Sequence, residues 1–261
     1  MGKPGQAEEI YRRAITVRSE YWRNYNLLGG FYVSQGRYPE AEQMFKKVIS
    51  LAPDSFRGYS NLGGVYILEG RYADAIGALE KSTAIRKTGS ALSNLGTADF
   101  HMRKFDEAAQ AYREAIDFDN DNYALWGNLA AAHYYGGRHS ESETEYRKSN
   151  QLAVRKLDIN PKDASALANV ADNYSMLGNR VKAFSYLDRA LKLLPQDPEL
   201  LFTAAQAYNQ FGDQERAIVF IQQALSAGCS PTEIRDAPAL DNLRSNAKFQ
   251  KLLLTGIPTN R

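Results

Sequence analysis

The sequence predicts an all-α protein, an α-solenoid of stacked and antiparallel helix pairs. Apolar residues recur at positions i, i+3, i+4 and i+7 between glycine and proline breaks, and no stretch alternates as a strand would. The segment 22–88 also repeats itself, because Gly29 and Tyr32 correspond to Gly63 and Tyr66 at one constant interval. A fixed period of this size is typical of solenoids, in which each unit buries its apolar face against the next.

Composition sets the broad class of the protein. The chain has 261 residues, 44% of them hydrophobic, which is enough apolar surface for a continuous core. A net charge of +2 gives no reason to expect a nucleic acid or a membrane as partner. Cys229 is the single cysteine, so an internal disulfide and a cysteine metal cluster are excluded. With no long apolar run and no signal-peptide core, we expect a cytoplasmic protein.

Residues 1–21 precede the first full unit. Counting back one repeat interval from Ala41 and Phe45 gives Ala7 and Tyr11, so the segment matches the second helix of a unit without its first helix. Two interpretations stay open. The segment is a partial repeat, which would make the chain a fragment of a longer protein, or it is itself the N-terminal cap.

Six full units are predicted after this segment. In each, a small residue in the first helix, a tight turn and a second small residue in the second helix recur in order. The predicted units span residues 22–55, 56–88, 89–122, 123–163, 164–197 and 198–229. Their first-helix small residues are Gly29, Gly63, Gly96, Ala130, Ala171 and Ala205, and turns are expected at Gly36, Gly70, Gly137, Gly178 and Gly212.

The fourth unit is longer than the others. The stretch from Tyr146 to Pro161 is nearly twice as long as the corresponding stretch from Phe45 to Pro53. The additional residues make two helical turns of about 10 Å, which keep the packing face in register. The extended second helix either projects a ledge for a partner or packs on the next unit.

The C-terminal residues depart from the repeat. Ser230 is a good N-cap, Pro231 suits the first helical position, and Glu233 completes a capping box. We therefore predict capping helices over residues 230–254 and a frayed tail over 255–261. The apolar residues expected to cover the last unit are Leu240, Leu243, Phe249, Leu252 and Leu253.

The repeated order of an aromatic residue or leucine, Leu-Gly, Tyr, Ala, a large residue, Ala and Pro resembles the tetratricopeptide repeat (TPR). The resemblance covers nearly the whole chain and implies a right-handed superhelix whose first helices line a concave groove. Asp99 and His133 depart from the pattern, since they stand where the repeat prefers tyrosine. The C-terminal segment also resembles the ending of TPR arrays in bacterial multidomain signalling proteins.

Catalytic chemistry has little support in the sequence. His101, His133 and His139 include no pair at the i, i+4 spacing of a helical zinc site, and no carboxylates pair in an evident pocket. The Gly-Gly pairs at 29–30 and 63–64 are interpreted as packing residues inside helices. We expect no enzyme activity, no metal and no cofactor.

Binding is better supported, because asparagines recur at the sixth position of four consecutive units. An amide both donates and accepts hydrogen bonds, so it can pair with the backbone of an extended peptide. This series resembles the asparagine ladder by which some TPR superhelices hold peptides; the alternative is that asparagine is simply common at this position. The predicted ladder is Asn61, Asn94, Asn128 and Asn169.

Side chains beside the ladder are expected to set selectivity. Apolar and aromatic residues on a concave wall favour apolar side chains of a ligand, and arginines at one rim favour a carboxylate. The wall residues are Ile67, Phe100, His101, Tyr134, Tyr135 and Met176, and the rim arginines are Arg23 and Arg57.

The sequence thus predicts a non-catalytic scaffold that binds a protein or an extended peptide in its groove. One alternative is a C-terminal regulatory or docking arm of a larger bacterial signalling enzyme or transcriptional regulator. Another is a self-association module that forms a homodimer through residues 6–20.

Overall fold

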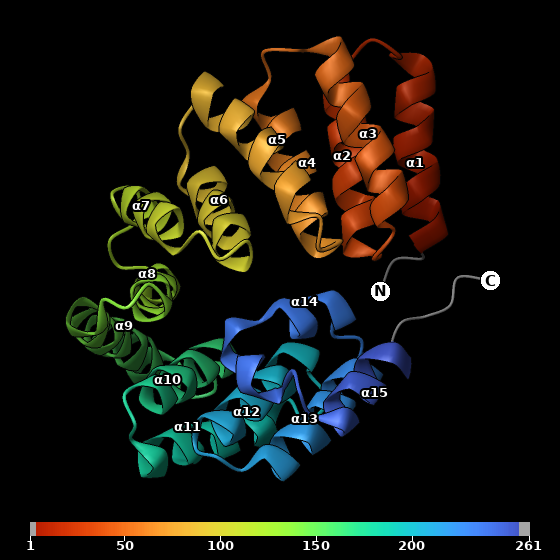
Figure 1. Cartoon of the computed structure of the whole chain (residues 1–261). Helices are drawn as coiled ribbons and strands as arrows, with labels where there is room; N and C mark the ends of the chain where they lie inside the picture. The colour runs from red at the N-terminus through yellow and green to blue at the C-terminus, as the bar shows by residue number, and fades with distance from the viewer. Residues whose placement is uncertain (1–3, 256–261) are drawn as a thin grey trace. The chain divides into compact units, whose positions relative to one another are not determined.

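A computed structural model describes residues 4–255, and within them every regular element is helical (Figure 1). The all-α prediction is therefore confirmed. The elements are α1 Pro4–Val17, α2 Trp22–Ser34, α3 Tyr38–Leu51, α4 Phe56–Leu68, α5 Tyr72–Ile85, α6 Gly89–His101, α7 Phe105–Ile116, α8 Tyr123–Tyr135, α9 His139–Ile159, α10 Ala164–Met176, α11 Arg180–Leu193, α12 Pro198–Gln210, α13 Gln214–Ala227, α14 Pro231–Asp236, the 3-10 helix η1 Pro238–Leu243 and α15 Ala247–Thr255. None of these helices is both long and apolar enough to cross a membrane.

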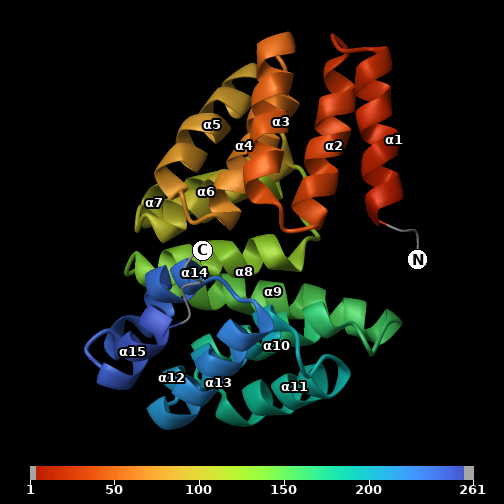
Figure 2. The same ribbon diagram turned by 90° about the vertical axis from the view of Figure 1, so that its right-hand side faces the viewer.

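The chain divides after Met102 into two compact units, which are described separately. Unit 1 contains α1 to α6, and unit 2 contains α7 to α15. Within each unit, successive helices pack against their neighbours along the chain, as in a solenoid. Figure 2 shows α1 beside α2, which is the first of these pairs in unit 1.

The tight turns inside the repeats depend on left-handed backbone. The predicted turn glycines all have positive φ, for example 68° at Gly36 and 80° at Gly137, a conformation that glycine adopts without a Cβ penalty. The third repeat, where no turn glycine was predicted, has Arg103 with φ of 61° at the corresponding turn. Arg103 is the one non-glycine residue with positive φ in the described part of the chain.

Glycines in the first helices allow close approach of the second helices. A Cβ added at Gly29 would lie 2.6 Å from Phe45 Cε1, and one at Gly63 would lie 2.5 Å from Leu79 Cγ. The predicted packing role of these two glycines is confirmed, because no side chain fits there without moving the partner.

The second glycine of each pair behaves differently. A Cβ at Gly30 would meet nothing within 4 Å, and one at Gly64 would lie 3.8 Å from Asn94 Nδ2. The prediction that Gly30 and Gly64 are packing residues is therefore wrong. Successive residues of a helix point about 100° apart, so only one glycine of each pair can face the partner helix.

A hydrogen-bonded cluster joins α1 to the first full repeat of unit 1. Tyr32 Oη donates to Glu8 Oε1 at 2.9 Å, and Arg37 pairs with Glu8 Oε2 at 2.6 Å while its guanidinium lies 4.3 Å from the Tyr32 ring centre. The hydrogen bond from Tyr32, together with those from Arg12 and Arg37, lowers the pKa of Glu8 to about 2. A carboxylate at this place thus joins the first helix to the next repeat.

The same arrangement recurs one repeat later. Tyr66 Oη donates to Glu42 Oε1 at 3.1 Å, and Arg71 pairs with Glu42 Oε2 at 2.9 Å and lies 4.1 Å from the Tyr66 ring centre. The recurring tyrosine therefore packs by its ring and joins consecutive repeats by its hydroxyl.

Unit 2 contains the long helix α9. Its added turns carry Leu152 and Leu157, which are buried, and Ala153 and Leu157 belong to one core cluster with Leu167 and Val170 of α10. Of the two alternatives for this extension, the structure favours packing on the next repeat.

His133 occupies a packing position of unit 2. It is 1% exposed, and its Nδ1 lies 2.7 Å from Glu145 Oε2 while Arg113 lies 3.3 Å from its Nε2. A polar ring in place of the repeat tyrosine is accommodated because both nitrogens have partners.

The C-terminal helices cover the last repeat. Ser230 Oγ accepts a hydrogen bond from the Glu233 amide, as the capping box predicts. Leu240, Leu243 and Phe249 are at most 1% exposed, and they share one core cluster with α12 and α13. The predicted frayed tail lies outside the described residues, apart from Thr255, which ends α15.

Candidate functional site

One candidate binding surface is a groove of about 700 Å³ in unit 1, which we call the unit 1 groove. Helices α2, α4 and α6, the first helices of three successive repeats, supply most of its lining. None of the lining side chains is charged. They include Asn26, Leu27, Gly30, Phe31, Val33, Ser60, Asn61, Gly64, Ile67, Leu68, Ser90 and Asn94.

Asparagine side chains line the unit 1 groove. Asn61 and Asn94 of the predicted ladder both line it, and Asn61 Nδ2 donates to Asn26 Oδ1 at 2.7 Å. Asn26 was not predicted from the sequence, because Leu27 occupies the sixth position of the first repeat and Asn26 is one residue off the register. The interval between Asn26 and Asn61, which is close to one repeat, was the available signal.

Glycine widens the unit 1 groove. Gly30 and Gly64 line it; a Cβ at Gly30 would meet nothing within 4 Å, and one at Gly64 would reach only Asn94 Nδ2, at 3.8 Å. A backbone without a Cβ allows an incoming chain to approach the helix closely. This feature was also missed, since both glycines were assigned to helix packing.

Two predicted arginines lie at the starts of the helices that form the unit 1 groove. Arg57 is one turn before Ser60 on α4, and Arg23 precedes Asn26 on α2 by the same spacing. Both are exposed; their guanidinium carbons lie 4.8 Å from the Phe56 ring centre and 5.5 Å from that of Trp22. Within the described residues neither arginine is paired with a carboxylate, so both are available to an acidic group.

Of the remaining predicted residues of unit 1, some line the groove and others do not. Ile67 lines the groove, whereas Phe100 and His101 at the end of α6 are not among its lining residues. The His101 ring is stacked on Tyr72 with centroids 4.4 Å apart. Its ring face is thus covered from within the protein.

The ladder asparagines of unit 2 have different surroundings. Asn128 on α8 is exposed to solvent. Asn169 Oδ1 accepts hydrogen bonds from Ser149 Oγ at 3.0 Å and from Asn173 Nδ2 at 3.0 Å. The amide oxygen of Asn169 is therefore part of an internal hydrogen-bond network, while the side chain of Asn128 faces water.

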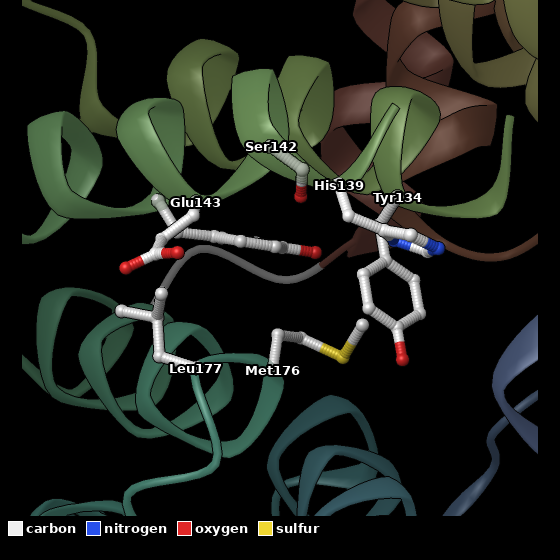
Figure 3. Close-up of a pocket in the computed structure, with 7 residues that line it drawn as sticks. Tyr134, His139, Ser142, Glu143, Met176 and Leu177 are labelled. Atoms are coloured by element: carbon white, nitrogen blue, oxygen red, sulfur yellow. The ribbon is translucent and has the colours of Figure 1, made fainter. Parts of the chain in front are cut away.

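Three predicted wall residues belong to unit 2. Tyr134 and Met176 line a second cavity of about 430 Å³ between α8, α9 and α10 (Figure 3). Tyr135 is half-buried and stacked on Phe105 at 5.9 Å, and burial, with smaller contributions from nearby acidic groups, raises its pKa above the usual range.

Polar contacts join the C-terminal helices to the rest of unit 2. Asn209 Nδ2, at the end of α12, donates to the Ala239 carbonyl at 2.7 Å. Arg103 forms a two-point ion pair with Asp241, with Nη1–Oδ2 at 2.8 Å and Nη2–Oδ1 at 2.5 Å. This pair joins the turn before α7 to η1 and is partly exposed, so we expect it to stabilise by no more than about 1 kcal/mol.

The repeat pattern also agrees with known families. Residues 2–198 match the family described as the Cilia and flagella-associated protein 70 C-terminal domain, and residues 198–227 match the tetratricopeptide repeat. The chain belongs to this family of tetratricopeptide-repeat proteins. No curated protein sequence matches the chain.

Solved structures support the TPR fold. A tetratricopeptide repeat protein from Parabacteroides merdae is 17% identical, with a TM-score of 0.63 over 97% of this chain and 92% of that one. The APC/C hetero-tetramer Cut9–Hcn1 gives a TM-score of 0.67 at 17% identity over 98% of this chain, which spans only 46% of the matched chain. YrrB, described as a TPR protein with an unusual peptide-binding site, gives 0.52 at 20% identity over 74% of this chain and 97% of that one.

Beside the last TPR unit, three potential ligand groups lie close together. The side-chain donor atoms of Glu199, Cys229 and Glu233 are all within 4.8 Å of one another. Burial, and secondarily the charge of Glu199, raises the pKa of Glu233 to about 7, and burial raises that of the Cys229 thiol above its usual range. Cys229 is 4% exposed and belongs to the core cluster of the last repeat, so its side chain has a packing role there.

Replacing Glu233 with Gln is expected to stabilise the protein at alkaline pH. A carboxyl whose folded pKa is raised contributes stability below its unfolded pKa of about 4.5 and loses it as pH rises through about 7. Glu233→Gln should therefore raise the free energy of unfolding by about 1–2 kcal/mol above pH 7, and this advantage should vanish toward pH 4. Urea unfolding of both proteins across this range checks it, and a pH-independent difference would contradict it.

Proposed function

We propose that this TPR protein is a non-catalytic protein–protein interaction scaffold that holds an extended peptide segment of its partner in the unit 1 groove. The observation that carries the proposal is an uncharged groove in which amides alternate with apolar side chains. Asn26, Asn61 and Asn94 belong to three successive helices, and Ile67 and Leu68 lie beside them. This combination offers hydrogen bonds to a backbone and apolar contacts to its side chains.

The chemistry of the groove describes its ligand. Gly30 and Gly64 leave room for a main chain to approach, and the absence of charge in the lining favours apolar side chains. Arg23 and Arg57, near the groove, suit an acidic residue or a terminal carboxylate at one end of the ligand. We therefore propose a protein or peptide partner, a role that requires neither nucleic acid nor a membrane, and a cytoplasmic location.

The comparisons support the broad function. Tetratricopeptide arrays form scaffolds for protein–protein interaction, and one structural neighbour, YrrB, is described as having a peptide-binding site. Because the chain spans less than half of the matched Cut9–Hcn1 chain, a docking arm of a larger protein is an alternative form of the same proposal. A bacterial signalling enzyme or transcriptional regulator would be the larger protein in that case.

One observation favours self-association as a second candidate function. On α1, Ile10 is 67% exposed and Val17 is 74% exposed, so this helix presents apolar side chains to solvent. A second copy could cover them and form a homodimer through residues 6–20. Light scattering at several concentrations tests this, and a monomer mass throughout would contradict it.

Asn94→Ala is expected to weaken peptide binding without loss of helicity. Short peptides selected from a random display library on the intact protein serve as ligands, and fluorescence anisotropy measures their affinity. Loss of one backbone hydrogen bond should weaken binding about 3- to 10-fold. Asn128→Ala tests whether the ladder proposed from the sequence continues to that residue, and unchanged affinity of both variants would reject the ladder.

A filled groove supplies the matched control for these measurements. Gly64→Leu places a side chain in the groove beside Asn94, whereas Gly77→Leu places one on α5, where a Cβ meets nothing within 4 Å. Both substitutions should leave the fold intact, but only Gly64→Leu should abolish binding. Equal binding by the two variants would show that the selected peptides lie elsewhere.

A further inference from the structure

The cavity between α8, α9 and α10 has features that the unit 1 groove lacks. It has a volume of about 430 Å³, and Figure 3 shows side chains of α8 and α9 facing those at the end of α10 across it. We call it the Tyr146 cavity. Its lining includes Tyr134, Ser142, Glu143, Tyr146, Met176 and Leu177.

Two buried residues with hydroxyl groups line the Tyr146 cavity. Ser142 is 1% exposed and Tyr146 is 2% exposed, yet neither hydroxyl has a hydrogen-bond partner within residues 4–255. Neither oxygen is among the fully buried polar atoms of the described residues, so both are accessible from the cavity that they line. A hydrogen-bonding group that enters the cavity can therefore pair with them.

The surroundings of the Tyr146 cavity are acidic. Burial, and after it the nearby charges of Asp172 and Glu145, raises the pKa of Tyr146 well above its usual range. Glu143 also lines the cavity: Arg147 pairs with its Oε1 at 2.6 Å, and its Oε2 has no partner in the described part of the chain. His139 is the one lining residue that could carry a positive charge. The unpaired Oε2 of Glu143 therefore offers a cationic donor an acceptor at the cavity.

The apolar lining suits a cation on an aliphatic stem. Met176 and Leu177 form one side of the cavity, and the Tyr134 ring forms another (Figure 3). An alkyl chain packs on the first two, and a flat cation stacks on an aromatic face. A guanidinium also has five N–H donors in a plane, which can reach a carboxylate and two hydroxyls at once.

We propose that the Tyr146 cavity receives an arginine side chain of the partner protein. This proposal depends on the scaffold function only in that the arginine comes from a partner. It uses different residues from the unit 1 groove, so either proposal can fail alone. The guanidinium lies between Tyr134 and Glu143 and donates to the hydroxyls of Ser142 and Tyr146.

Methyl NMR of the full chain tests this assignment with a defined probe. The chain has four methionines, and Met176 lies in the cavity while Met44 lies in unit 1. N-acetyl-arginine methylamide should shift the 13C-methyl signal of Met176 saturably and leave that of Met44 unchanged. Its neutral analogue, N-acetyl-citrulline methylamide, should bind at least about tenfold more weakly, because charged hydrogen bonds are lost.

Variants separate the hydroxyl and carboxylate contributions. Tyr146→Phe keeps the buried ring and should weaken binding of the arginine probe about 3- to 10-fold. Glu143→Gln should weaken it by a similar factor. Ser142→Ala removes the second hydroxyl and replaces either variant if that variant does not fold. Equal shifts with the citrulline probe, equal shifts at Met44, or an unchanged affinity in all variants would each overturn the proposal.

Discussion

Phe249→Ala is expected to lower the free energy of unfolding by about 3–5 kcal/mol. Phe249 on α15 is 1% exposed and packs in one cluster with Leu240, Leu243 and Ile221 of α13. Removing the ring loses its transfer free energy and leaves a cavity in the core that the C-terminal helices complete. Urea unfolding followed by circular dichroism measures the change.

A second residue of α15 is the control for this prediction. Leu254→Ala removes an apolar side chain that is 76% exposed, so its effect should stay within about 0.5 kcal/mol. If both variants unfold like the parent protein, the C-terminal helices are not part of the cooperative core. If only Phe249→Ala destabilises, residues 238–255 belong to the same folding unit as the last repeat.

Gly63→Leu is expected to destabilise the protein by about 3 kcal/mol. The first atom of any side chain at this position would lie 2.5 Å from Leu79 Cγ, and Leu79 is fully buried. The two helices of the repeat must therefore separate, or Leu79 must leave its place. The shift of the thermal or urea unfolding midpoint measures this destabilisation.

The matched control uses a glycine in the next helix. Gly77 on α5 has open space at its Cβ, so Gly77→Leu should leave stability unchanged or raise it by roughly 1 kcal/mol through helix propensity. A parent-like midpoint for Gly63→Leu would mean that the repeat interval does not mark the helix contacts.

The helices, turns and packing glycines follow from local spacing, and for this reason they were predictable. Gly29 and Gly63 recur with the tyrosines that bind Glu8 and Glu42, and Ser230 caps its helix in the predicted way. Each of these features depends on residues within a few turns of one another, or within one repeat.

The candidate sites were only partly predictable. Asn61, Asn94 and Ile67, which were predicted as binding residues, line the unit 1 groove. Asn26 was not predicted because it stands one position off the repeat register. A shift of one residue rotates a side chain by about 100°, and its direction then depends on how adjacent helices are inclined. The internal hydrogen bonds of Asn169 depend on Ser149 and Asn173, which no repeat position specifies.

The sequence by itself determined the helical period, the repeat and the family of this protein. Each unit buries its apolar face against the next, so every copy needs similar packing residues at the same positions. Only the tertiary structure decided which polar groups meet. Arg103 and Asp241 lie far apart in the chain, and Ser142 and Tyr146 of α9 meet Met176 of α10 through the packing of these two helices. Such contacts depend on how several helix pairs pack together, and the repeat pattern of the sequence does not specify that packing.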